Sequence, residues 1–121
     1  MINVPGYDYG TLIPTARIFL GNNLFDDVSW VYGGNGVFLN AGGGAFPNTS
    51  GAQDITLDHN TVFQSGNFAG IGCCTGNPMP NVTFTNNIFG EGTYGWFVSG
   101  KGQSYSALQS VMNPLTFVNN V

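Results

Sequence analysis

Short stretches in which apolar and polar residues alternate run along most of the chain. In Ile55-Thr56-Leu57-Asp58 the first and third residues are apolar, and residues 82–85 repeat the pattern with Val, Thr, Phe and Thr. This alternation predicts β-strands that bury one face. No window keeps apolar residues at helical spacing without an interrupting Gly or Pro. We therefore expect an all-β chain built from short strands.

One strand pattern recurs four times along the chain. Each copy is a short strand, a polar corner that holds Asn, and the start of a second strand. The corner asparagines are 37, 27 and 33 residues apart, and a weaker Gly-bounded apolar element lies inside each interval. A unit of this size cannot bury its apolar side alone, so the repeat predicts a stacked architecture. The corner residues are Asn23, Asn60, Asn87 and Asn120.

The segments DITLDHNTVF (54–63) and NVTFTNNIF (81–89) resemble successive turns, or rungs, of right-handed parallel β-helix proteins of the pectate-lyase-like superfamily. The resemblance covers residues 18–121. It implies a single-stranded right-handed parallel β-helix of about three to four rungs. It does not imply an activity, because this repeat occurs in lyases, hydrolases, epimerases and proteins with no known reaction.

The uneven repeat spacing indicates where loops leave the rungs. We expect an irregular N-terminal segment at 1–16 and rungs over 17–121, with loops near 41–53 and 101–114. Within the second loop, residues 104–112 are the piece that could form a helical turn. Loops are where function usually lies on a repeat scaffold.

Stacking of the rungs predicts columns of equivalent residues. Strand alternation places one apolar column through the interior, and a second column two residues further along each strand. Asn tolerates the left-handed conformation that a sharp corner needs, and stacked amides can hydrogen-bond from rung to rung. We therefore expect the corner asparagines to form a structural ladder. The two apolar columns are Ile18, Ile55, Val82 and Leu115, and Leu20, Leu57, Phe84 and Phe117.

Composition and charge exclude several functions. Only 7% of the 121 residues are charged, and the net charge is −4. Arg17 and Lys101 cannot make the basic face that nucleic acid or an anionic membrane requires. No run approaches the ~20 apolar residues that span a bilayer. Ten Phe, five Tyr and two Trp argue against disorder, and the first residues lack the charged and apolar regions of a signal peptide.

Catalytic patterns are weak. Asp26 and Asp27 are adjacent acids, the residue type that glycoside hydrolases use in pairs. The polygalacturonase-type β-helices add a third Asp and a Gly-His-Gly segment, whereas the only histidine here, His59, stands between Asp58 and Asn60. Adjacent strand residues point to opposite faces, so Asp58 and His59 are not expected to pair. Six scattered acids and two bases do not supply a calcium-dependent lyase site. We expect no catalytic residue, metal or cofactor.

The only cysteines, Cys73 and Cys74, are adjacent. A disulfide framework joins residues that are distant in sequence, and a neighbouring pair closes almost no loop. Three interpretations stay open: small residues in a Gly-rich turn, a strained vicinal disulfide, or an intermolecular bridge. Two cysteines and one histidine are too few for a zinc site.

Aromatic residues are the best candidates for binding. Tyr94 and Trp96 offer flat faces for sugar rings and polar tips that tolerate water, so we predict that they bind carbohydrate. The alternative is that alternate members of these aromatic runs fill the interior. Trp30 and Tyr32 form a second aromatic pair before the first long loop.

Two hypotheses for function follow. The first is a non-catalytic β-helix module or segment of a larger exported protein, extracellular or at the cell surface, that offers a rigid surface for carbohydrate contact or self-assembly. The sequence stops at Val121 within a repeat element, and solenoids need caps. We therefore expect either a segment of a longer β-helix or head-to-tail self-association into a filament. The second hypothesis is a fragment of a polysaccharide lyase or glycoside hydrolase.

Overall fold

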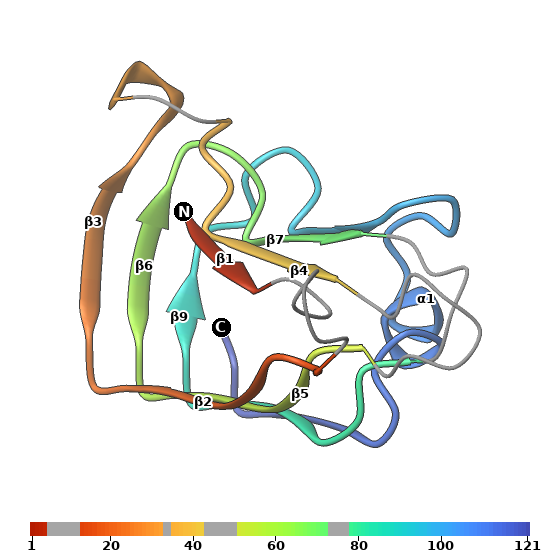
Figure 1. Ribbon diagram of the computed structural model, residues 1–121. Coiled ribbons are helices and arrows are strands. Elements are labelled where there is room, and N and C mark those ends of the chain that lie inside the picture. The colour runs from red at the N-terminus through yellow and green to blue at the C-terminus, as the bar shows by residue number, and fades with distance from the viewer. Residues whose placement is uncertain (5–12, 33–34, 43–50, 73–77) are drawn as a thin grey trace.

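The computed structural model describes residues 1–4, 13–32, 35–42, 51–72 and 78–121. Over these ranges the protein is all-β, with one 3-10 turn, η1 (Trp30–Tyr32), and one short helix, α1 (Tyr105–Gln109) (Figure 1). The strands are β1 (Ile2–Val4), β2 (Ala16–Gly21), β3 (Leu24–Val28), β4 (Leu39–Gly42), β5 (Gln53–Asp58), β6 (Thr61–Gln64), β7 (Ala69–Gly72), β8 (Val82–Thr85), β9 (Ile88–Phe89), β10 (Trp96–Val98) and β11 (Leu115–Val118).

The strands form three parallel sheets that the chain visits in rotation. Sheet A has the order β1-β4-β7-β10, sheet B has β2-β5-β8-β11, and sheet C has β3-β6-β9. All the strand pairs within them are parallel. The chain passes through sheets A, B and C before it returns to A, so each circuit adds one strand to each sheet. Figure 1 shows β3, β6 and β9 side by side on one flank, with α1 on the opposite flank.

The register of sheet B matches the repeat seen in the sequence. Ile55 pairs with Ile18 on one side and Val82 on the other, and Leu115 pairs with Val82. The second column lies two residues further along each strand. In it Leu57 pairs with Leu20 on one side and Phe84 on the other, and Phe117 pairs with Phe84. The two central strands bury these side chains almost completely, whereas the outer strands leave them half-buried. Strand alternation and the fourfold repeat are together sufficient to predict both columns.

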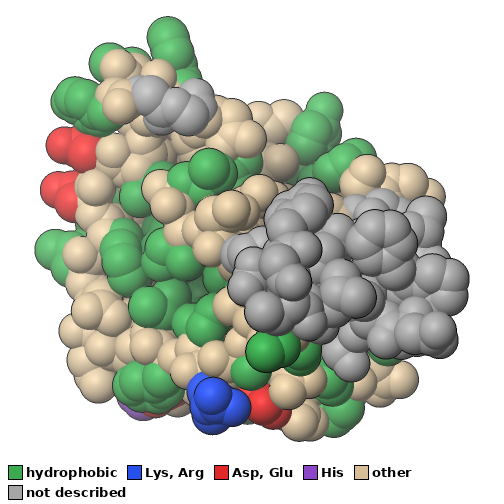
Figure 2. Space-filling view, in the orientation of Figure 1, with side chains coloured by type: hydrophobic (Ala, Val, Ile, Leu, Met, Phe, Trp, Pro, Cys, Tyr) green, Lys and Arg blue, Asp and Glu red, His purple; other side chains and the backbone are tan. Residues whose placement is uncertain are grey.

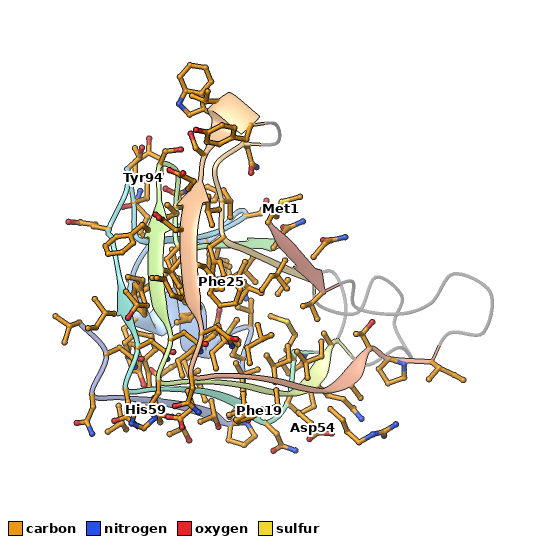
Figure 3. All side chains as sticks on the ribbon, turned by 90° about the vertical axis from the view of Figure 1, so that its left-hand side faces the viewer. Met1, Phe19, Phe25, Asp54, His59 and Tyr94 are labelled. Atoms are coloured by element: carbon orange, nitrogen blue, oxygen red, sulfur yellow. The ribbon has the colours of Figure 1, made fainter. Side chains whose placement is uncertain are left out.

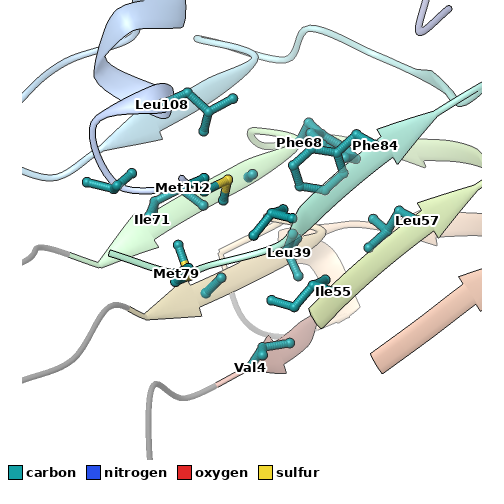
Figure 4. Packing of buried hydrophobic residues seen from close by; sticks show 14 of the residues in the cluster. Val4, Leu39, Ile55, Leu57, Phe68, Ile71, Met79, Phe84, Leu108 and Met112 are labelled. Atoms are coloured by element: carbon teal, nitrogen blue, oxygen red, sulfur yellow. The ribbon is translucent and has the colours of Figure 1, made fainter. Parts of the chain in front are cut away.

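The three sheets enclose one hydrophobic core (Figure 4). Within this core, phenylalanine rings contact one another in series. The ring of Phe68 stacks on Phe89 with centroids 3.7 Å apart, and it lies 5.7 Å from Phe38 and 5.8 Å from Phe84. Burial of each such ring contributes roughly 1.5–3 kcal/mol. The core therefore links all three sheets: Phe89 belongs to sheet C, Phe84 to sheet B, and Phe68 precedes β7 of sheet A.

The structure changes the predicted boundaries in two places, and in a third segment it forms a helix where the sequence allows a helical turn. Residues 2–4, expected to be irregular, form β1, in which Ile2 pairs with Leu39 of β4. The predicted loop at 41–53 begins inside β4 and ends at the first residue of β5, and residues 43–50 lie outside the described ranges. The predicted loop at 101–114 contains α1, whose N-cap Ser104 accepts a hydrogen bond from the backbone N–H of Ala107 at 3.1 Å. Cys73 and Cys74 also lie outside the described residues.

At the corner between sheets B and C, one residue in each circuit adopts the left-handed conformation. The sequence suggests the ladder asparagines for this role, but the structure assigns it to the residue just before each of them. Asn tolerates this backbone better than most residues, and His is also enriched there. The preceding residue therefore makes the turn and frees the next one to point inward. The left-handed residues are Asn22, His59, Asn86 and Asn119, with φ of 57°, 53°, 57° and 55°.

Candidate functional site

The corner asparagines are hydrogen-bonded in series. Nδ2 of Asn60 donates to Oδ1 of Asn87 at 3.0 Å and to the carbonyl of Leu20 at 2.9 Å. Oδ1 of Asn60 accepts from the backbone N–H and from Nδ2 of Asn23. Asn87 repeats the arrangement toward Asn120 at 2.8 Å. Asn60 and Asn87 are 1% exposed, and these contacts occupy their amides.

Asp58 and His59 lie in contact, which corrects the expectation that they point apart. The left-handed backbone at His59 turns its ring back, so that Nδ1 lies 2.8 Å from Oδ2 of Asp58. Oδ1 of Asp58 accepts from Oγ1 of Thr85 at 2.7 Å and from Nδ2 of Asn86 at 2.9 Å. The hydrogen bonds from His59, Thr85 and Asn86 lower the pKa of Asp58 from 3.8 to about 2. Figure 3 shows His59 at the outer corner, remote from Tyr94.

Asp26 and Asp27 form a β-bulge. Phe25 pairs with Val62, but the next pair is Val28 with Gln64, so β3 carries one extra residue. Asp27 has φ 54°, and its N–H donates to Oδ1 of Asp26 at 2.9 Å. Figure 2 shows acidic side chains on the flank where β3 lies. The two carboxylates line shallow hollows of about 340 Å³ and about 270 Å³.

The aromatic pair Trp30 and Tyr32 lies on η1, which projects beyond the end of β3 (Figure 1). These side chains are 67% and 74% exposed. The turn is held by its backbone: the N–H of Trp30 donates to Oγ of Ser65, and that of Tyr32 to the carbonyl of Ser29. This turn therefore leaves both aromatic residues exposed, and Tyr32 also lines the hollow of about 270 Å³.

Tyr94 and Trp96 line one hollow of about 390 Å³, which we call the aromatic hollow. Its walls come from β9, the connection between β9 and β10, β10 itself, the segment before α1, and the last residue. The sequence pattern indicates two of the lining residues and misses the others, because these come from segments that only the fold brings together. The lining residues are Phe89, Glu91, Tyr94, Gly95, Trp96, Gln103 and Val121.

The connection between β9 and β10 is held against the preceding circuit, and this positions Tyr94. Its backbone N–H donates to Oδ1 of Asn67 at 3.1 Å, and the carbonyl of Gly95 accepts from the N–H of Ala69 at 3.2 Å. Gly92 has φ 62°, and a Cβ there would lie 1.9 Å from the carbonyl oxygen of Gly66. Only glycine permits this close approach. Tyr94 therefore stands on a fixed backbone, with its side chain 48% exposed.

Trp96 forms the inner wall of the hollow. It is the first residue of β10, pairs with Ala69 and is partly buried. Its ring meets Phe117 edge-on, with centroids 5.4 Å apart. Its Nε1 is buried and has no hydrogen-bond partner among the described residues. A buried donor without an acceptor costs about 1–3 kcal/mol.

The comparisons with known proteins give no lead for this chain. It matches no protein-family model, no curated protein and no solved structure.

In the described part of the chain, no helix has the length and hydropathy to cross a membrane. Across the same residues, no three His, Cys, Asp or Glu side chains gather into a group that could hold a metal ion. Of the three hollows above, the aromatic hollow is the one lined by both Tyr and Trp.

Proposed function

We propose that the chain is a right-handed parallel β-helix module that binds carbohydrate, without transforming it, at the aromatic hollow. Three parallel sheets visited in rotation and asparagines bonded in series support this fold. The observation that carries the binding is a single hollow whose walls include Tyr94 and Trp96 together with the polar side chains of Glu91 and Gln103. We propose further that the module belongs to an exported protein and acts outside the cell or at its surface.

The chemistry of the hollow suits a saccharide. The faces of Tyr94 and Trp96 can pack against the C–H faces of a sugar ring while their polar tips stay hydrated. The carboxylate of Glu91 can accept hydrogen bonds from hydroxyl groups, and the amide of Gln103 can both donate and accept. The volume, about 390 Å³, falls at the lower end of the roughly 300–1,000 Å³ typical of small-molecule sites. A short stretch of a glycan would fill it.

Binding without hydrolysis is the better proposal for this hollow. Glycosidases place two carboxyl groups on either side of the scissile bond. Among the described lining residues, Glu91 is the only acid. Asp26 and Asp27 line other hollows. The alternative, a fragment of a polysaccharide lyase or hydrolase, therefore has to draw its catalytic pair from elsewhere.

Affinity electrophoresis through gels that contain soluble polysaccharides tests the proposal. We expect the protein to be retarded, and Tyr94→Ala to bind about tenfold more weakly, equivalent to about 1.4 kcal/mol. Tyr32→Ala is the matched control, because it removes an exposed tyrosine outside the hollow. The proposal fails if no polysaccharide retards the protein, or if Tyr94→Ala binds like the parent. Polysaccharide cleavage that is lost in Asp27→Asn would support the enzyme alternative.

A second candidate function, head-to-tail self-association, draws on the edges of the sheets. The first circuit (β1, β2, β3) and the last strands (β9, β10, β11) each have a neighbour in the sheet on one side only. In the asparagine series each Nδ2 donates to the next Oδ1. Nδ2 of Asn120 instead donates to the carbonyls of Phe84 and Val118, and exchange of the exposed Val118 bond would let it donate to Asn23 of another copy. Figure 2 shows hydrophobic side chains gathered on the face between β3 and β1. Such a contact does not close and would give a filament.

A further inference from the structure

We infer that the aromatic hollow selects uncharged saccharides over uronates and other anionic sugars. This inference rests on the proposed carbohydrate binding and adds the class of ligand. It is carried by the distribution of charge around the hollow. Among the described lining residues, Glu91 is the only one with a charged side chain, and this charge is negative.

The two basic residues of the chain are poorly placed to balance an anionic sugar. Arg17 lies on β2, at the far edge of sheet B from β11. Three strand spacings, about 14 Å, separate these strands, and this distance exceeds the screening length of roughly 8 Å at physiological salt. Lys101 does not line the hollow, and its Nζ donates to Oγ of Ser110 at 3.0 Å.

The polar groups of the hollow match hydroxyls rather than carboxylates. Glu91 can only accept hydrogen bonds when it is ionised, so it needs a ligand that donates them. Sugar hydroxyls donate, whereas a uronate carboxylate would meet Glu91 as a like charge. The amide of Gln103 supplies a neutral donor, which a hydroxyl or ring oxygen can satisfy. The net charge of −4 adds a longer-range repulsion of polyanions.

A pair of polymers that share one backbone and differ in charge gives the sharpest test. Polygalacturonate and its fully methyl-esterified form share one backbone, and isothermal titration can compare their affinities. We expect the esterified polymer to bind at least about tenfold more tightly at low salt, and the gap to narrow in about 0.5 M NaCl because salt screens the repulsion. Glu91→Gln should narrow the gap at low salt by raising affinity for polygalacturonate. Lys101→Ala is the control and should change neither affinity.

The possible outcomes distinguish the charge selectivity from the proposed carbohydrate binding on which it rests. Equal or tighter binding of polygalacturonate, or its weakening by Lys101→Ala, overturns the charge selectivity and leaves carbohydrate binding in place. If Glu91→Gln leaves the difference in affinity between the two polymers unchanged, Glu91 does not cause that difference. This result overturns the inference. If neither polymer binds, and no member of a panel of neutral glucans, xylans and mannans binds either, the proposed carbohydrate binding is wrong. The inferred charge selectivity is then wrong as well.

Discussion

At each corner between sheets B and C, two neighbouring residues have different structural roles. The first, such as Asn86, adopts the left-handed backbone that makes the turn. The second, such as Asn87, extends its amide along the stack and satisfies both its own polar groups and a carbonyl of the preceding circuit. A polar side chain can be buried at a dry corner because its hydrogen-bonding groups are paired.

Substitution of a buried ladder residue should therefore be costly. Asn87→Ala removes the acceptor of the Asn60 amide and the donor to the carbonyl of Leu57, both at a buried site. Each buried group left unpaired costs about 1–3 kcal/mol. We expect a loss of roughly 3 kcal/mol in the free energy of unfolding, and a melting temperature lower by roughly 10 °C, measured by circular dichroism.

Asn40→Ala is the matched control for this prediction. Nδ2 of Asn40 also donates to an asparagine one circuit away, Oδ1 of Asn3 at 2.9 Å, but at an exposed position in β4. Exposed groups exchange one partner for water, so the change should stay within about 0.5 kcal/mol. Equal losses in Asn87→Ala and Asn40→Ala would contradict the importance of burial in the ladder.

The lowered pKa of Asp58 predicts a specific loss of stability in acid. The carboxylate titrates at about 2 in the folded protein, against an ordinary 3.8, because its ionised form accepts hydrogen bonds from His59, Thr85 and Asn86. A lowered folded pKa stabilises the native state above the ordinary value, and this contribution is lost as the pH falls from about 4 to 2. Denaturant unfolding between pH 6 and pH 2 measures it. The stability difference between the parent and Asp58→Asn should be constant above pH 5 and shrink below pH 4; a difference independent of pH would contradict the prediction.

The short elements depend on their neighbours more than on their own sequence. β9 spans Ile88–Phe89 and β1 spans three residues, and isolated strands of this length are not stable. The connection between β9 and β10 is neither helix nor strand. It is hydrogen-bonded to Asn67 and Ala69, and it lies close to the backbone of Gly66. The site is thus built on an element that exists only because the preceding circuit supports it.

Gly92→Ala should disturb both this connection and the ligand site. A Cβ at Gly92 meets the backbone oxygen of Gly66 and also requires a strained φ of 62°. We expect a loss of about 3 kcal/mol in the free energy of unfolding, from roughly 1–2 kcal/mol of backbone strain and a similar amount of overpacking. Denaturant unfolding measures the loss, and polysaccharide binding should weaken because Tyr94 moves with the backbone.

Gly102→Ala separates the two causes. Gly102 has φ 89°, but a Cβ there would meet nothing within 4 Å. This variant therefore reports backbone strain alone, and it should lose only about 1–2 kcal/mol while polysaccharide binding is kept. If both glycine variants lose the same stability, the close approach to Gly66 contributes nothing.

At the scale of the whole molecule, the two candidate functions compete for one end of the stack. The aromatic hollow is lined by Phe89 of β9, Trp96 of β10 and Val121, and these strands lie at the edges of their sheets. A second copy that stacked on this end would cover the hollow. Carbohydrate binding and end-to-end assembly are therefore expected to exclude each other.

Sedimentation analysis of the 121-residue chain tests this competition. If the ends associate, the average mass should rise with concentration without reaching a plateau, because each added copy exposes a new end. A saturating polysaccharide ligand should return the mass to that of one chain with its ligand. A mass of 12.8 kDa at all concentrations would contradict self-association, and assembly unaffected by ligand would contradict the shared end.

The alternation of apolar and polar residues, and the recurrence of Asn, determined the strands, their parallel stacking and the columns of sheet B. These features follow from a period of two within each strand and from one repeat per circuit, and both patterns can be read directly along the sequence. Only the tertiary structure decided that Asp58 contacts His59 and that Gln103 and Val121 join Tyr94 and Trp96 in one hollow. The first depends on a left-handed turn at a single residue. The second depends on the length of each circuit, which decides the distant segments that meet.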